Sequence, residues 1–143
     1  MKQILLLALM MAITHFAMAE TQCADANNEL CIVVHSAELE CHKSSVSGYL
    51  SHCIASVAYD VSNDAKRNIE AKASCKVEIN YLKSVMGIRD TDRQQNSQID
   101  HLLANSKNRF TIPVEFNFST QIEANNAEIK SVNCRIASTL TSR

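Results

Sequence analysis

The chain has 143 residues, of which 14 are Lys or Arg and 15 are Asp or Glu, so its formal net charge is -1. The basic residues are scattered among acidic ones, which argues against nucleic-acid binding because phosphate contacts need clustered positive charge. Six cysteines stand against only two glycines. Beyond the N-terminus, no apolar run reaches the roughly 18 residues of a membrane-spanning helix, so we expect no membrane span.

The N-terminus has the pattern of a secretory signal peptide over residues 1–19. Lys2 supplies the positive charge, residues 4–13 supply the apolar stretch, and Ala17-Met18-Ala19 supplies the small residues before the cleavage point. We predict cleavage after Ala19. Removing 19 of the 143 residues leaves 124, with 13 basic and 15 acidic side chains. This length predicts a single domain over 20–143, exported to the periplasm or the extracellular space.

Alternating apolar and polar residues predict several β-strands in the exported chain. In the clearest segment, 69–81, every odd position is apolar or Cys and every even position is polar, as in a half-buried strand. Pro113 cannot donate to a β-ladder, so its segment is predicted to be an edge strand or to contain a bulge. The same alternation, or a shorter apolar run, marks the further segments 30–35, 53–61, 110–118 and 132–140.

The segment 91–104 departs from this alternation. Ile99, Leu102 and Leu103 recur at helical spacing behind Thr91-Asp92, which predicts a short helix, with a long polar loop as the alternative. The whole pattern predicts an all-β fold, an antiparallel two-sheet sandwich of about seven strands. The immunoglobulin or fibronectin type III plan is the default for such a sandwich, as an analogy of architecture.

The six cysteines of an exported chain predict three disulfides, since an oxidising compartment preserves bridges and the even count leaves no obligatory free thiol. Cys41 and Cys53 flank a predicted hairpin around Ser47-Gly48. A rival set exchanges partners among Cys53, Cys75 and Cys134, whose side chains all point inward by strand parity. The pairing that spacing and parity favour is Cys23 with Cys31, Cys41 with Cys53, and Cys75 with Cys134.

A concentration of imidazole and thiol groups raises the possibility of a metal site. His35, Cys41, His42, His52 and Cys53 fall within one short region, and these are ligands for soft and borderline metals. Adjacent strand residues point to opposite faces, however, and bridged cysteines lose their capacity as ligands. A metal-binding protein that uses the three histidines, with both cysteines reduced, is therefore the alternative function and no cofactor is the main expectation.

Motifs for catalysis are missing from the sequence. There is no GxSxG elbow, no CxxC, and too few glycines for phosphate-cradling loops. We therefore predict a protein that is not an enzyme. The expected function is non-catalytic binding of a protein partner, in a role related to virulence, pili or inhibition, through sheet faces, loops or an edge strand.

The polar segment 87–108 is the predicted contact region, because long insertions in a compact sandwich are often functional. Arg89, Arg93 and Arg109 are its candidate anchors, since arginine is enriched at interface hot spots. A solvated loop is the alternative. Unpaired strand edges would also allow a homodimer by edge pairing or strand exchange.

Overall fold

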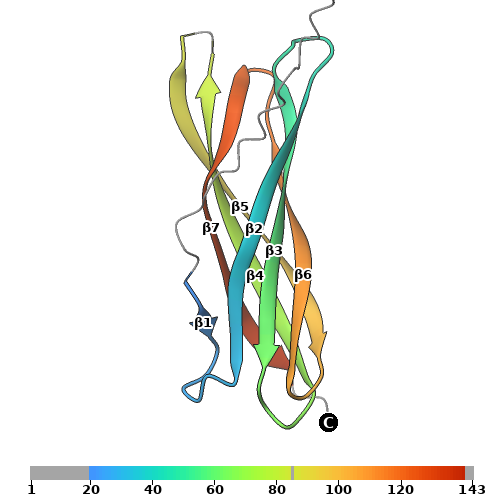
Figure 1. Ribbon diagram of the computed structural model, residues 1–143. Helices are drawn as coiled ribbons and strands as arrows, with labels where there is room; N and C mark the ends of the chain where they lie inside the picture. Colours follow the sequence, from blue (N-terminus) through green and yellow to red (C-terminus); the bar gives the residue numbers. More distant parts are fainter. Residues whose placement is uncertain (1–19, 85, 141–143) are drawn as a thin grey trace, which may run out of the picture.

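The computed structural model describes residues 20–84 and 86–140, which form two layers of long, twisted strands (Figure 1). The expected signal peptide, residues 1–19, lies outside the described residues. Within the described part of the chain there is no helix, and so none long and apolar enough to cross a membrane. The strands are β1 (Gln22–Cys23), β2 (Leu30–Lys43), β3 (Leu50–Asn63), β4 (Ile69–Lys83), β5 (Ile88–Leu102), β6 (Ser106–Asn117) and β7 (Ala124–Leu140).

The strands pair into two antiparallel sheets, ordered β1-β2-β3-β6 and β5-β4-β7. This confirms the predicted all-β, two-sheet architecture. An immunoglobulin constant-type domain joins its first, second, fifth and fourth strands in one sheet and its third, sixth and seventh in the other. The order here is different, so the immunoglobulin or fibronectin plan is not confirmed beyond two antiparallel sheets.

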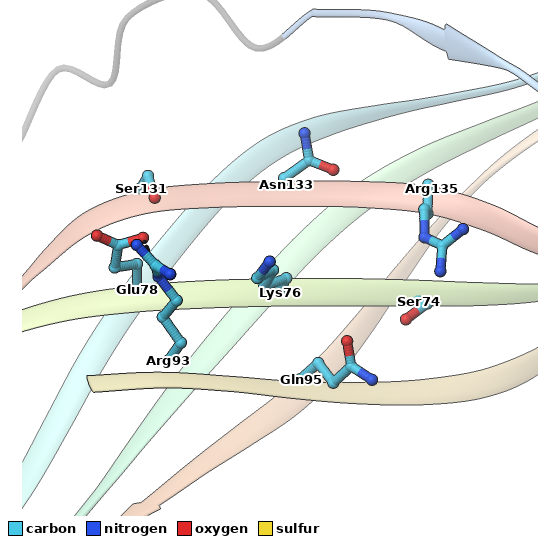
Figure 2. A pocket seen from close by; sticks show the side chains of 8 residues that line it. All are labelled: Ser74, Lys76, Glu78, Arg93, Gln95, Ser131, Asn133 and Arg135. Atoms are coloured by element: carbon cyan, nitrogen blue, oxygen red, sulfur yellow. Dashed lines mark hydrogen bonds and ion pairs between the residues drawn. The ribbon is translucent and has the colours of Figure 1, made fainter. Parts of the chain in front are cut away.

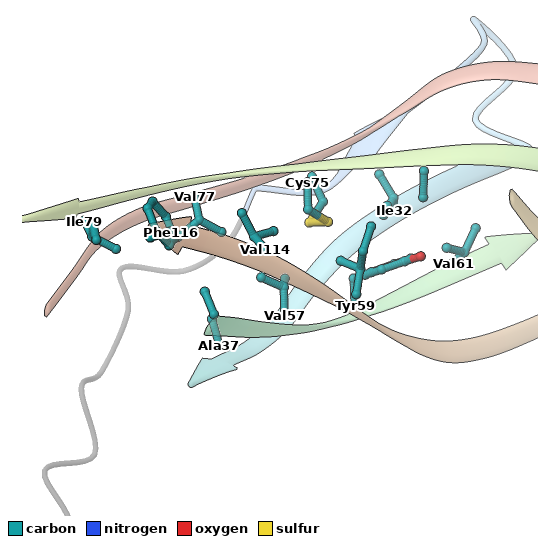
Figure 3. Packing of buried hydrophobic residues seen from close by; sticks show 14 of the residues in the cluster. Ile32, Ala37, Val57, Tyr59, Val61, Cys75, Val77, Ile79, Val114 and Phe116 are labelled. Atoms are coloured by element: carbon teal, nitrogen blue, oxygen red, sulfur yellow. A yellow bond between two sulfur atoms is a disulfide. The ribbon is translucent and has the colours of Figure 1, made fainter. Parts of the chain in front are cut away.

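The core lies between the sheets and follows the predicted parity. In β4, Val77 and Ile79 are fully buried, whereas Lys76 on the opposite face is exposed. Tyr59 and Phe116 contribute the largest fully buried side chains from the other sheet (Figure 3). Burying one such apolar side chain stabilises the fold by about 1.5–3 kcal/mol. The apolar alternation therefore determines which face of each strand points inward.

The helix predicted over 91–104 is wrong, and so is the alternative of a long loop. Strand β5 occupies this segment and pairs with β4 along its whole length, from Leu102 opposite Ile69 to Ile88 opposite Lys83. Strand β5 is the edge strand of its sheet. One of its faces is open to solvent and its inner face is largely polar, so the usual alternation of apolar and polar residues is absent. A turn at 103–105 then leads into β6.

The free edge of β5 is capped by its own side chains. Lys83 and Ile88 close the β4–β5 hairpin, so even-numbered residues of β5 direct their backbone groups toward β4 and odd-numbered residues direct theirs outward. Three of these outward N–H groups donate to the side-chain oxygen of the preceding residue, each at 2.8 Å: Thr91 to Asp90, Arg93 to Asp92, and Ser97 to Asn96. The caps occupy donors that an added strand would need.

Strand β6 is the edge strand of the other sheet, which confirms the expectation from Pro113. Pro113 has no N–H group to offer an added strand, and its carbonyl accepts a hydrogen bond of 2.7 Å from the Asn96 side chain of β5. The β5 and β6 edges are thus joined to each other where the two sheets meet.

The structure contains the three disulfides of the favoured pairing, and no described cysteine is free. Each bridge joins residues that lie directly opposite each other on neighbouring strands of one sheet. None of these three bridges joins one sheet to the other, so apart from the connecting loops the two sheets are held together by noncovalent contacts.

Candidate functional site

The outer face of the β5-β4-β7 sheet carries a shallow polar hollow of about 590 Å³ (Figure 2). Its volume falls in the range of ligand pockets, but such pockets usually have mainly apolar walls. Here every lining residue is polar or charged: Ser74, Lys76, Glu78, Arg93, Gln95, Ser131, Asn133 and Arg135. The hollow is therefore suited to polar contacts with an extended surface.

The antiparallel register places these side chains in three rows across the sheet. The rows are Ser97, Ser74 and Arg135; Gln95, Lys76 and Asn133; and Arg93, Glu78 and Ser131. Directly beneath, on the inward face, the Cys75–Cys134 disulfide joins β4 to β7. Because neighbouring strand residues point to opposite faces, the bridge fixes the relative position of Lys76 and Arg135.

Glu78 ties the three strands together at one end of the hollow. Its carboxylate accepts a hydrogen bond of 2.7 Å from Arg93 Nε of β5 and another of 2.7 Å from Lys130 Nζ of β7. These two cations, Arg93 first, lower the pKa of Glu78 to about 2. Glu78 therefore remains ionised at neutral pH with its charge already compensated.

Lys76 and Arg135 are different, because neither forms a salt bridge among the described residues. Figure 2 shows the Arg135 side chain reaching from β7 toward Ser74. The side-chain amides of Gln95 and Asn133 lie in the same row as Lys76. An Arg fork and a Lys ammonium beside neutral hydrogen-bonding groups form a favourable site for carboxylates.

The three arginines predicted as anchors are not brought together. Arg93 lines the hollow, and Arg89, farther along β5, lies 3.9 Å from Glu128. Arg109 belongs to the other sheet, where its Nε and Nη2 donate to the carboxylate of Asp60 at 2.8 and 3.2 Å. The hydrogen bond with Arg109 is the main reason why the pKa of Asp60 lies below its usual value.

The histidines of the alternative metal site are also separated. His42 and His52 are opposite each other on β2 and β3, but His35 lies seven residues away along β2, a distance of about 23 Å in a strand. Cys41 and Cys53 are bridged and offer no thiolate. Among the described residues, no group of three or more His, Cys, Asp or Glu side chains is placed to hold a metal ion.

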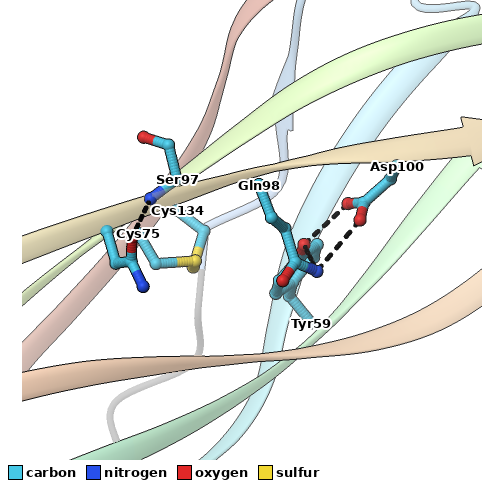
Figure 4. The surroundings of a disulfide bond; sticks show 7 residues. Tyr59, Cys75, Ser97, Gln98, Asp100 and Cys134 are labelled. Carbon is cyan, nitrogen blue, oxygen red and sulfur yellow. Dashed lines mark hydrogen bonds between the residues drawn. A yellow bond between two sulfur atoms is a disulfide. The ribbon is translucent and has the colours of Figure 1, made fainter.

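A buried polar cluster between the sheets was not predicted. The Tyr59 hydroxyl of β3 donates to Asp100 Oδ2 of β5 at 2.6 Å, and Gln98 Nε2 donates to both at 2.8 and 2.9 Å (Figure 4). Burial raises the pKa of Asp100, although the two hydrogen bonds oppose this shift. Burial and the Asp100 carboxylate raise the pKa of Tyr59. The cluster links the two sheets near the Cys75–Cys134 bridge.

Sequence reasoning also missed Lys76, Asn133 and Arg135 as site residues. A signal for them was present, because they are the outward neighbours of Cys75 and Cys134, and the favoured bridge already placed these cysteines side by side.

Comparisons with protein-family models, with curated protein sequences and with solved structures gave no match.

Proposed function

We propose that this protein is an exported, non-catalytic binding protein that uses the outer face of its β5-β4-β7 sheet to bind an acidic protein surface. The observation that carries the proposal is the pair of cations without salt bridges, Lys76 and Arg135, in a polar hollow. Three disulfides support work in an oxidising compartment, such as the periplasm or the extracellular space.

The β5 and β6 edges are poorly suited to strand addition, which favours a sheet face over either of these edges as the binding site. Strand addition depends on free backbone donors and acceptors along an exposed edge. On β5 three of these donors are capped by side chains, and on β6 Pro113 has no donor. A partner that approaches the outer face instead meets side chains in fixed rows.

The chemistry of the hollow supports binding without catalysis. Its one carboxylate, Glu78, is held by Arg93 and Lys130 with a pKa of about 2. A general base works best when its pKa lies near the operating pH. Glu78 is thus suited to positioning Arg93 and Lys130, and the remaining side chains of the hollow to hydrogen bonding.

Binding of a labelled oligoglutamate peptide, followed by fluorescence anisotropy, tests the proposal. Charged hydrogen bonds contribute about 1.5–3 kcal/mol each, so Lys76→Ala with Arg135→Ala should weaken binding at least tenfold. Lys66→Ala with Arg67→Ala, which removes two exposed cations from the β3–β4 loop, is the matched control and should bind as the wild type does. Equal binding of oligoglutamate by both double variants, or equal binding of oligolysine, would overturn the proposal.

A further inference from the structure

The outer face of the other sheet carries the opposite charge. Glu38 and Glu40 project from β2 and Glu115 from β6, and all three are exposed. None of them forms a salt bridge with Lys or Arg in the described part of the chain; Glu40 lies 3.6 Å from His42. We call these three residues the acidic face.

The register brings these carboxylates together across the sheet. Glu40 and Glu115 are both opposite Ile54 of β3, one on each side, and Glu38 is opposite Ser56. Neutral residues thus separate the carboxylates, and no cation lies in these two rows. The acidic face is a group of carboxylates on a regular surface, and none of them is paired with Lys or Arg among the described residues.

Three cations form the counterpart on the far side of the sandwich. Lys72 is exposed and precedes Lys76 on the outward side of β4, and Arg135 lies beside them on β7. None of the three has a salt-bridge partner among the described residues. We call them the basic face. The two faces carry three charged side chains each, of opposite sign, on opposite layers of one molecule.

We infer that the acidic partner of the basic face is the acidic face of a second copy of this chain. This inference rests on the proposed function and names its partner. The contact joins two different surfaces and is therefore heterologous, so each added copy leaves one acidic and one basic face open. The copies stack sheet against sheet in a row, and neither the capped β5 edge nor the β6 edge takes part.

Ionic strength provides the first test. The Debye length is about 30 Å at 0.01 M salt and about 3 Å at 1 M. In sedimentation equilibrium, the average mass of the wild type should rise with protein concentration at the lower salt and return to that of a monomer at the higher salt. A wild type that stays monomeric throughout the micromolar range at low salt would overturn the inference.

Two charge-neutralised variants provide the second test. Lys76→Ala with Arg135→Ala removes two of the three cations of the basic face, and Glu38→Gln with Glu40→Gln removes two of the three carboxylates of the acidic face. Each variant alone should self-associate at least tenfold more weakly than the wild type. An equimolar mixture should form a one-to-one heterodimer and stop there, because only one intact contact remains. Lys66→Ala with Arg67→Ala, and Asp64→Asn with Glu20→Gln, are exposed controls that should associate as the wild type does.

The outcomes separate this inference from the proposed function. Self-association that persists in both face variants would overturn stacking and indicate edge pairing or strand exchange. If the wild type is monomeric but still binds oligoglutamate through Lys76 and Arg135, the inference fails while the proposed function stands. If the mixture forms no heterodimer although the wild type associates, the contact does not join these two faces.

Discussion

Removing the Tyr59 hydroxyl tests whether the buried cluster contributes to the contact between the two sheets. Tyr59 is fully buried and Asp100 is 4% exposed, so water cannot replace the lost 2.6 Å hydrogen bond without opening the core. A hydrogen bond to a charged group contributes about 1.5–3 kcal/mol. Tyr59→Phe should therefore lower the free energy of unfolding in urea at pH 7 by about that amount, with an unchanged m-value.

A double-mutant cycle identifies the charge as the cause. Between two neutral groups the same bond is worth about 0.5–1.5 kcal/mol, so Tyr59→Phe should cost less in an Asp100→Asn background. Burial raises the pKa of Asp100 in the folded state. The stability contributed by protonated Asp100 is therefore present below its unfolded pKa and is lost as the pH rises through its folded pKa. Asp100→Asn should remove this loss. Equal urea midpoints for wild type and Tyr59→Phe would refute the reasoning.

Three further predictions concern the sheet that carries the hollow. Cys75→Ala with Cys134→Ala opens a loop with a sequence separation of 59 residues, and should lower the free energy of unfolding by about 4 kcal/mol in the chain-entropy model; a urea midpoint equal to that of the oxidised wild type would contradict this. Val77→Asp places an unpaired charge in the core and should cost several kcal/mol, whereas Lys76→Asp on the solvent side should be nearly neutral; equal midpoints for the two variants would count against the observed parity. Glu78 has its pKa lowered from 4.5 to about 2, so its contribution is present above pH 4.5 and is lost as the pH falls through about 2. Melting curves of Glu78→Gln should therefore depend less on pH in that window than those of the wild type, and parallel profiles would refute the assignment.

The strands that sequence predicted correctly are those with one buried face. In 69–81 and 53–61 the apolar residues alternate because the inward positions lie in the core, and β4 and β3 occupy these segments. Strand β5 could not be recognised in this way. Its inward positions include Gln94, Asn96 and Gln98, which lie at the open side of the sandwich, and Ile99 is exposed.

The candidate site was predictable only in part, for a related reason. Parity places Lys76 and Arg135 on the outward faces of their strands, but their uncompensated charges depend on which strands flank β4. The sequence does not determine that order. Only when β5 and β7 are placed on either side of β4 does it become visible that Arg93 and Lys130 pair with Glu78, so that Lys76 and Arg135 are left without a salt bridge among the described residues. The favoured cysteine pairing, in contrast, needed only local hairpins and one long-range pair of inward cysteines.

The position of the Cys75–Cys134 bridge also sets how the molecule would respond to mechanical load. Strands β5 and β6 lie entirely within the loop that it closes, so tension entering along β4 passes through the two sulfur atoms directly into β7. The loop spans a sequence separation of 59 residues, so a molecule with this bridge intact would extend, when pulled by its ends, about 200 Å less than one in which this bridge alone is broken. The edge strand that supplies Arg93 to the hollow would bear none of that force.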